Sequence, residues 1–303
     1  MSLWSSRNSH LCSALVAGIL GSLVGLGCGK KAEVDVSGKE TAPETQAQSG
    51  QTGTSKTVDA VPVSRNGAVQ RDRLHASFTD AVRGPDNPPA DAVRPPDETV
   101  SGKKVHRILD QVRTTWDEIR FTTPAGKKIS YRAKVTTTEG TFEVQLLSDQ
   151  APNHVRNFVA LARAGYYDQL QFERVRQDQN EMKQELHWLE AGCPLGTGMS
   201  GTGSIGYWVK EEFTPAEKMT HEEGVLGAIR GEEPDSAGTR FYVNLAKAPF
   251  LDGNYTIFGK VIDGMDLVRK IGRSPVVIDD EGNRRPEKAV VIEKITITTQ
   301  ELP

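Results

Sequence analysis

The sequence has few cysteines and almost no excess of either charge. Its three cysteines, Cys12, Cys28 and Cys193, are too few and too widely spaced for a disulfide framework or a cysteine-ligated zinc site. Lysine and arginine number 37 against 40 aspartates and glutamates, a net charge of -3, so the basic surface of a nucleic-acid-binding protein is missing. Hydrophobic residues make up 37% of the 303 residues, which is enough for a globular core.

The N-terminal apolar run is short. Residues 11–26 fall below the roughly 20 residues of a membrane span but match the core of a signal peptide. The run ends in Gly25-Leu26-Gly27-Cys28, which resembles a bacterial lipobox, although that pattern prefers leucine where Gly25 stands. We expect a signal peptide over residues 1–28, with Cys28 lipidated and anchored in a membrane on the periplasmic side of a cell envelope. An ordinary cleaved signal and a retained anchor helix are the alternatives.

Residues 29–104 show almost no periodic apolar pattern. The segment contains ETAPETQAQSGQTGTSKT and later RGPDNPPADAVRPPDETVSGKK, which are polar and rich in turn-forming residues. Such a composition buries too little apolar surface to offset the chain entropy lost on folding. We therefore expect a disordered linker, stiffened toward polyproline II by the prolines between 85 and 96.

Apolar periodicity begins in a lead-in segment, residues 105–130. Spacings of three and four predict an amphipathic helix there, formed by Val105, Ile108, Leu109, Val112, Trp116 and Ile119. From Tyr131 the period changes to two, and a Glu139-Gly140 turn predicts a hairpin. Pro152 at a first helical position and Gly165 at a helix end predict a helix between them.

Short strands dominate the rest of the chain. They are predicted at 170–175, 206–209, 224–230, 241–245, 255–261 and 288–298, with a short helix at 265–271. Many short strands with few helices are typical of a closed β-barrel. We expect one mainly β domain over residues 131–303.

Three stretches resemble the cyclophilin-type peptidyl-prolyl isomerases. They are APNHVRNFVALARAGYYDQLQFERV (151–175), GTGSIGYWVKEEF (201–213) and EGVLGAIRGEEPDSAGTRFYVNLAKAPFLDGNYTIFGKVIDGMDLVRKI (223–271). The resemblance extends over residues 131–298. It implies a closed eight-stranded antiparallel barrel capped by two helices, with a shallow proline-peptide groove on its outside. It also implies that no metal or cofactor is needed.

An isomerase of this kind needs few chemical groups. Rotating an X-Pro bond breaks no covalent bond, so the enzyme requires an apolar slot for the proline ring and a donor that favours the twisted amide. Arg174, in Phe172-Glu173-Arg174-Val175, matches the family's catalytic arginine; read without the family, it is an outward-facing strand arginine. The resemblance implies a substrate-binding set of Phe172, Trp188, Glu190, Arg230, Arg240, Phe241, Tyr242, Phe250, Leu251 and Tyr255.

Several of these positions depart from the family pattern. An insertion over 176–187 follows Arg174, and Glu190 and Arg240 each stand where the family has glutamine. Tyr242 replaces a phenylalanine, and Tyr255 stands where histidine is common. A carboxylate at 190 could either orient the Arg174 guanidinium or divert its donors from substrate.

Two functions are therefore open. The first is a monomeric peptidyl-prolyl isomerase that assists the folding of Pro-containing polypeptides in the cell envelope. The alternative is a catalytically weak or inactive module that binds Pro-containing segments of envelope proteins. Arg174 favours the enzyme, whereas the changed neighbours favour the binding module. Nucleic acid is excluded as a partner by the charge balance.

Overall fold

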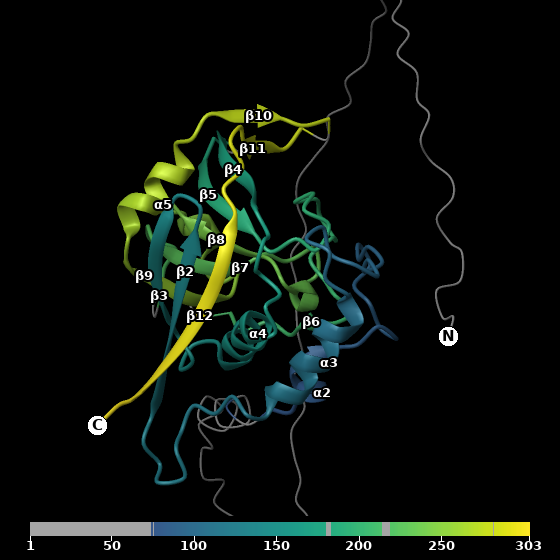
Figure 1. Ribbon diagram of the computed structural model, residues 1–303, viewed down its shortest axis with the longest axis vertical. Helices are drawn as coiled ribbons and strands as arrows, with labels where there is room; N and C mark the ends of the chain where they lie inside the picture. The colour runs from purple at the N-terminus through teal and green to yellow at the C-terminus, as the bar shows by residue number, and fades with distance from the viewer. Residues whose placement is uncertain (1–73, 75, 180–182, 214–218, 281) are drawn as a thin grey trace, which may run out of the picture. The chain divides into compact units, whose positions relative to one another are not determined.

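Eight antiparallel strands form the central sheet of the computed structural model, which describes residues 74, 76–179, 183–213, 219–280 and 282–303. The strand order is β12-β2-β3-β9-β7-β8-β5-β4 (Figure 1). The strand bounds are β2 Ile129–Thr137, β3 Gly140–Leu146, β4 Phe172–Gln179, β5 Glu185–Ala191, β7 Val225–Ala228, β8 Phe241–Asn244, β9 Ile257–Asp263 and β12 Ile292–Glu301. The predicted hairpin is confirmed, because β2 and β3 pair from Tyr131 with Leu146 to Thr137 with Gly140.

The expectation of a closed barrel is wrong, since the sheet is an open, curled half-barrel with β12 and β4 as its edge strands. Within the described ranges, these edges meet only around the bridge of Gln171 with Val291, where backbone hydrogen bonds join residues 169–172 to residues 290–292, and they form no continuous ladder. Beyond this bridge, β4 lies beside the hairpin of residues 276–286, where Arg284 donates to the carbonyl of Gln177, and not beside β12. On its other side, β4 stays paired with β5 out to Gln179 and Glu185, whereas β5 pairs with β8 only from Trp188 onward. The insertion thus lengthens a hairpin that runs past the sheet.

Two small sheets complete the strand pairing. Pairs of short strands form them: β1 Val82–Arg83 with β6 Trp208–Val209, and β10 Val276–Ile278 with β11 Arg284–Pro286. The β10–β11 hairpin lies beside β4, where Arg284 donates to the carbonyl of Gln177 at 3.2 Å. Neither β1 nor the β10–β11 pair was predicted, because these strands of two or three residues are too short to show a period of two.

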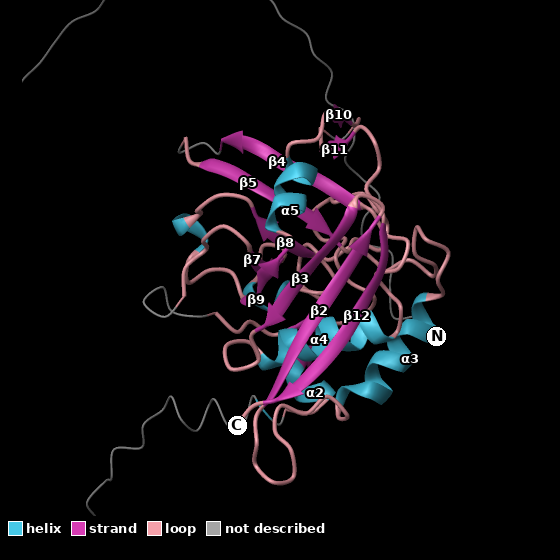
Figure 2. Ribbon diagram, turned by 60° about the vertical axis from the view of Figure 1, so that its left-hand side comes forward, coloured by secondary structure: helices cyan, strands magenta, loops and turns pink. Residues whose placement is uncertain are grey.

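Four α-helices accompany the sheet in the described part of the chain. They are α2 Phe78–Ala81, α3 Val105–Trp116, α4 Pro152–Arg163 and α5 Met265–Gly272, with 3₁₀ turns η1 Pro234–Ser236 and η2 Pro249–Leu251. The predicted helices at 105, 152 and 265 are confirmed. Figure 2 shows α5 near the β4–β5 hairpin and α4 beside β12 and β2, with α3 packed against α4. The N-terminus of α4 is capped from a distance, since Glu212 accepts from the backbone N–H groups of Asn153 and His154.

The structure differs from the expected linker over residues 76–104, which pack against the folded domain. Phe78 makes edge-on ring contacts with Trp116 of α3 and Tyr207, at centroid distances of 5.3 and 5.1 Å. Trp116 is fully buried and donates from Nε1 to the carbonyl of Ala76. Composition missed this because a few well-placed apolar residues anchor a segment that is otherwise polar.

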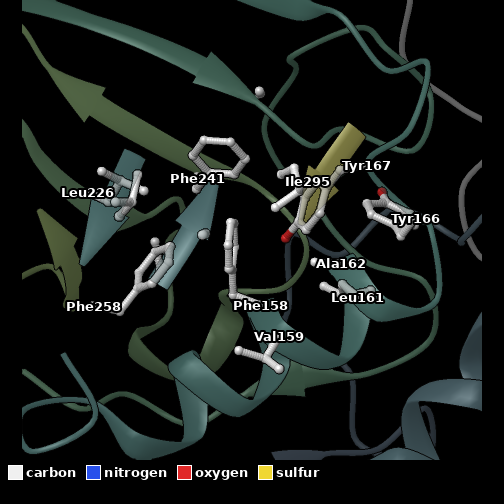
Figure 3. Close-up of a cluster of buried hydrophobic side chains, with 14 of the residues drawn as sticks. Phe158, Val159, Leu161, Ala162, Tyr166, Tyr167, Leu226, Phe241, Phe258 and Ile295 are labelled. Atoms are coloured by element: carbon white, nitrogen blue, oxygen red, sulfur yellow. The ribbon is translucent and has the colours of Figure 1, made fainter. Parts of the chain in front are cut away.

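The core lies inside the curl of the sheet. Phe158 of α4 lies between Phe241 of β8 and Phe258 of β9, at ring-centroid distances of 5.6 and 5.5 Å (Figure 3). Tyr167 packs on both Phe158 and Phe241. Aromatic pairs of this geometry contribute about 0.5–1.5 kcal/mol each beyond the area they bury. The core therefore fixes the positions of α4 and β8. Because side chains alternate along a strand, it also fixes which side chains of β8 point to the outer face.

The N-terminal predictions lie outside the described residues. These are the signal peptide over 1–28, lipidation at Cys28 and the linker up to residue 73. Across the ranges that the structure describes, no helix has the length and apolar character needed to cross a bilayer.

Candidate active site

Strand register brings the main candidate residues onto one face. Arg174 of β4 pairs with Glu190 of β5, Glu190 pairs with Tyr242 of β8, and Tyr242 pairs with Gly227 of β7. Directly opposed residues of antiparallel strands project to the same side of a sheet. Phe241, next to Tyr242, projects into the core instead. Arg174, Glu190 and Tyr242 therefore form a row on the outer face.

A β-bulge sets the start of this row. The register shifts between Phe172, which pairs with Ala191, and Arg174, which pairs with Glu190. Glu173 is the extra residue, and its carboxylate is buried against the backbone N–H of Cys193. Bulges commonly redirect a side chain beside an active site. Phe172 on the other side of the bulge lies in the core, so the predicted substrate contacts of Phe172 and Phe241 are corrected.

An aromatic cluster lies beside the row on the outer face. Tyr242 is its buried centre, and Trp188 and Tyr255 lie at ring-centroid distances of 6.0 and 6.3 Å from it. We call this set the outer cluster: Trp188, Ile229, Tyr242, Ala248, Phe250, Leu251 and Tyr255. It contains five of the predicted substrate-binding residues. Because Trp188, Phe250 and Tyr255 are only half-buried, they leave apolar surface that a proline ring could cover.

Glu190 is held mainly by Arg240, not by Arg174. Its Oε2 lies 2.7 Å from Nη2 of Arg240 and 3.7 Å from Nη1 of Arg174, and the latter separation exceeds a hydrogen bond. Its Oε1 accepts from Nε1 of Trp188 at 2.8 Å. The geometry therefore does not favour the alternative in which Glu190 diverts the hydrogen-bond donors of Arg174 from substrate. The side chain of Arg174 is one-fifth exposed beside the outer cluster, and burial lowers the pKa of Arg174 while leaving it charged.

Arg240 is the centre of a buried charge cluster. It donates from Nε to Glu173 at 3.1 Å and from Nη2 to Glu190, and it binds the carbonyls of Met199 and Gly198 at 2.8 and 2.9 Å. Burial opposes the charge of Arg240, but the two carboxylates raise its pKa overall. Two departures that looked separate in the sequence thus form one ion pair. Arg240 acts within this cluster and leaves Arg174 as the partly exposed cation of the row.

A hydrogen-bonded chain supports Tyr242 from behind. Its hydroxyl lies 2.7 Å from Nε2 of His221, whose Nδ1 lies 2.7 Å from Oδ1 of Asp252. The carboxylate accepts the Nδ1 proton, so Nε2 of neutral His221 accepts from the tyrosine. Gly227 makes room for this arrangement, because a Cβ there would lie 2.1 Å from the tyrosine hydroxyl. The hydroxyl is thereby satisfied on its inner side. The sequence did not predict these hydrogen bonds, because residues 221, 242 and 252 form no recognisable motif.

We expect stability to fall in mild acid because of His221. Burial lowers its pKa below the ordinary 6.5 despite the nearby Asp252, so the unfolded chain binds the proton more readily. The contribution of neutral His221 to the free energy of unfolding is complete above about pH 6.5. It is lost as the pH falls through the pKa of His221 in the folded state. Melting temperatures from pH 7.5 to 5.5 should fall less steeply in His221→Gln than in the wild type. The exposed His106→Gln is the matched control and should follow the wild type; equal slopes in all three proteins would contradict the assignment.

Arg230 fixes the rim of the outer cluster. Its guanidinium lies 4.6 Å from the ring centroid of Tyr255, and it donates to the carbonyls of Asn254 and Gly231 at 3.0 and 2.9 Å. Leu251 and Phe250 reach the cluster from η2. In the described ranges no three histidine, cysteine, aspartate or glutamate side chains gather closely enough to hold a metal ion.

Fold and site together define a cyclophilin-like protein, and comparison with known proteins agrees. The model of the cyclophilin type peptidyl-prolyl cis-trans isomerase family matches residues 132–297. This range exceeds half of the chain and contains every predicted catalytic and substrate-binding residue. The chain belongs to the cyclophilin-type peptidyl-prolyl cis-trans isomerase family.

Individual relatives show the same coverage. The protein named peptidyl-prolyl cis-trans isomerase-like 1 from Neurospora crassa is 36% identical over 167 residues, covering 55% of this chain and 94% of the relative. The mouse protein of the same name is 34% identical over 158 residues, covering 52% and 87%. A crystal structure of a Cryptosporidium parvum cyclophilin type isomerase matches with a TM-score of 0.47 and 26% identity, covering 56% of this chain and 98% of that one.

Proposed function

We propose that this chain isomerises X-Pro bonds with Arg174 as its catalytic residue. The barrier of about 18–20 kcal/mol comes from the partial double bond of the amide, so a catalyst must favour the twisted state over the planar one. The twist weakens amide resonance and leaves a lone pair on the prolyl nitrogen. A guanidinium fork can donate both to that nitrogen and to the prolyl carbonyl oxygen.

The observation that carries this proposal is the division of roles between two arginines. Arg240 takes the closest hydrogen bond of Glu190, so Arg174 stays partly exposed beside the outer cluster. The proline ring would cover the half-buried Trp188, Phe250 and Tyr255, which pack around the buried Tyr242. An apolar surface with one positioned cation is the minimum that the reaction needs. Isomerisation kinetics on short X-Pro peptides test it.

The second candidate is a Pro-peptide binding module. It is favoured by the exchange of two neutral glutamine positions for a Glu190–Arg240 ion pair, which changes the field around Arg174. In that case the outer cluster would bind Pro-containing segments without turnover. Peptide titration alongside kinetics separates the two, because both functions require binding and only one requires a rate.

For location, we propose a monomer tethered by lipid in a bacterial cell envelope, assisting protein folding there. The support is the sequence of residues 1–28, with an apolar core and a terminal Cys28. Lipid chains contribute about 0.8 kcal/mol per buried methylene to membrane binding.

Replacement of the thiol tests the tether directly. Cys28→Ser should abolish incorporation of labelled fatty acid and shift the protein from the membrane fraction, since the thiol is the proposed acylation site. Cys12→Ser lies in the segment that would be removed and is the matched control; it should be labelled as well as the wild type. Labelling of Cys28→Ser, or no labelling of the wild type, would refute lipidation.

A further inference from the structure

A small pocket adjoins the candidate active site and is filled by the chain itself. One side is formed by Ile229, Arg230, Gly231 and Arg240, and the other by Asp91 and Ala92. Ile229 belongs to the outer cluster, and both arginines were predicted substrate-binding residues, so this pocket continues the site. We call it the flanking pocket. Its remaining cavity is about 10 Å³, the lower limit for a single water molecule. A substrate side chain cannot enter while the N-terminal segment stays in place.

The segment that fills it, which we call the strap, is residues 88–93. Its backbone is fixed at two points: Ala90 N–H donates to Oε1 of Glu233 at 2.7 Å, and Val93 N–H donates to the carbonyl of Gly201 at 3.1 Å. Arg83, before the strap, pairs with the same Glu233. The strap is therefore built onto the two loops that border the flanking pocket.

The side chain of Asp91 reaches between these loops. Its Oδ2 accepts from the backbone N–H of Glu232 at 3.2 Å and from Oγ of Ser200 at 3.3 Å. Its Oδ1 is buried and has no hydrogen-bond partner in the described structure. An unpaired buried acceptor is unfavourable, so packing alone does not explain an aspartate here. The carboxylate instead places negative charge in a pocket lined by Arg230, whose guanidinium donates to the backbone carbonyls of Asn254, Gly231 and Glu232.

Gly231 is shaped to the strap. A Cβ at this position would lie 2.3 Å from Oδ2 of Asp91, far inside contact distance. Its φ is not in the left-handed region, so the backbone gives no reason for glycine. Gly201 also approaches Asp91 closely, but its φ of 73° is itself a reason for glycine. Gly231 therefore marks the position where the loop accommodates the aspartate.

We propose that Asp91 is a specificity-determining residue. As the chain's own occupant of the flanking pocket, it denies that pocket to substrate side chains that flank the X-Pro bond, and acidic side chains above all. The isomerase would then show little selectivity for residues outside the X-Pro unit. This inference rests on the proposed function, because it assigns the peptide that the same site accepts.

Removal of the carboxylate gives the first test. The substrates are pairs of peptides with one X-Pro bond, and the two peptides of a pair differ only by Glu or Ala at one of the three positions on either side of that bond. The value of kcat/KM is measured for both peptides of each pair. In the wild type the Glu-to-Ala ratio should be at or below one throughout. In Asp91→Ala it should rise by about threefold or more at one or more positions, as expected for a newly available charge pair. The exposed Asp86→Ala is the matched control and should keep the wild-type ratios.

A second variant tests the strap without changing its sequence. Gly231→Ala should push Asp91 out of the flanking pocket and raise the same ratios, and circular dichroism should show an intact domain. Asp91→Asn keeps the volume of the strap and removes its charge, so it should shift the ratios less than Asp91→Ala. Unchanged ratios in both Asp91→Ala and Gly231→Ala would overturn the inference.

The outcomes separate this inference from the proposed function. An active wild type with ratios that no variant changes refutes only the role of Asp91. A wild type without turnover on any peptide refutes the isomerase proposal. The same peptide pairs are then compared by association constant, the reciprocal of Kd, and the expected and contradicting Glu-to-Ala ratios of association constants are those given for kcat/KM.

Discussion

Replacement of Arg174 by alanine is expected to lower kcat/KM for X-Pro isomerisation by about 100-fold or more, which corresponds to about 2.7 kcal/mol of transition-state stabilisation. The reason is that Arg174 is the partly exposed cation of the row beside the outer cluster, whereas Arg240 is bound by two carboxylates and two carbonyls. Loss of a donor that acts mainly on the twisted amide should reduce kcat, with a smaller change in KM.

Two further variants make that result specific. Arg174→Lys keeps the charge but loses the planar fork, so it should recover only part of the lost activity. Arg132→Ala removes an exposed strand arginine from β2 and should match the wild type. If Arg174→Ala retains activity within about twofold, with its fold intact, Arg174 is not the catalytic residue.

The largest effect on stability is expected at Arg240. Arg240→Gln leaves Glu173 and Glu190 buried without their shared cation, and breaking a buried pair in this way costs about 3–5 kcal/mol. In a folded unit of this size, such a loss lowers the melting temperature by roughly 10 °C. Glu190→Gln should cost less, because Arg240 keeps its bond to Glu173 and a glutamine can still accept from Trp188.

A double-mutant cycle measures the coupling. The free energy of unfolding of Glu190→Gln/Arg240→Gln, from urea titration, should be higher than the sum of the single losses predicts. Strictly additive losses would mean that Glu190 and Arg240 do not stabilise each other. Kinetics on Glu190→Gln provide a second readout: because Glu190 is bound to Arg240, kcat/KM should change by less than about threefold.

Periodicity predicted the parts of this fold whose contacts are local. The helices at 105, 152 and 265 and the hairpin at 131 follow from spacing and turn residues alone, and all are present. The family resemblance placed Arg174, Glu190 and Tyr242 at the site, and the strand register puts them in one row. It assigned Phe172 and Phe241 to the substrate as well, although the β-bulge at Glu173 turns Phe172 into the core and strand alternation turns Phe241 there.

The remaining features depend on contacts between residues far apart in the sequence. Glu173 and Arg240 lie 67 positions apart, and His221 and Asp252 lie 31 apart. The spacing of such residues carries no signal until the fold brings them together. The same holds for the strap, whose proline-rich composition is typical of a linker but whose Asp91 is fixed by Glu232 and Ser200, more than 100 positions away.

The most direct test of the isomerase assignment is a protease-free measurement of X-Pro exchange by NMR on the wild-type protein. The cis–trans exchange rate of a short Pro peptide should rise in proportion to protein concentration, well above its uncatalysed value, which corresponds to tens to hundreds of seconds at 25 °C. An exchange rate equal to the uncatalysed rate, in a sample where peptide titration shows binding, would contradict catalysis and identify a Pro-peptide binding module instead.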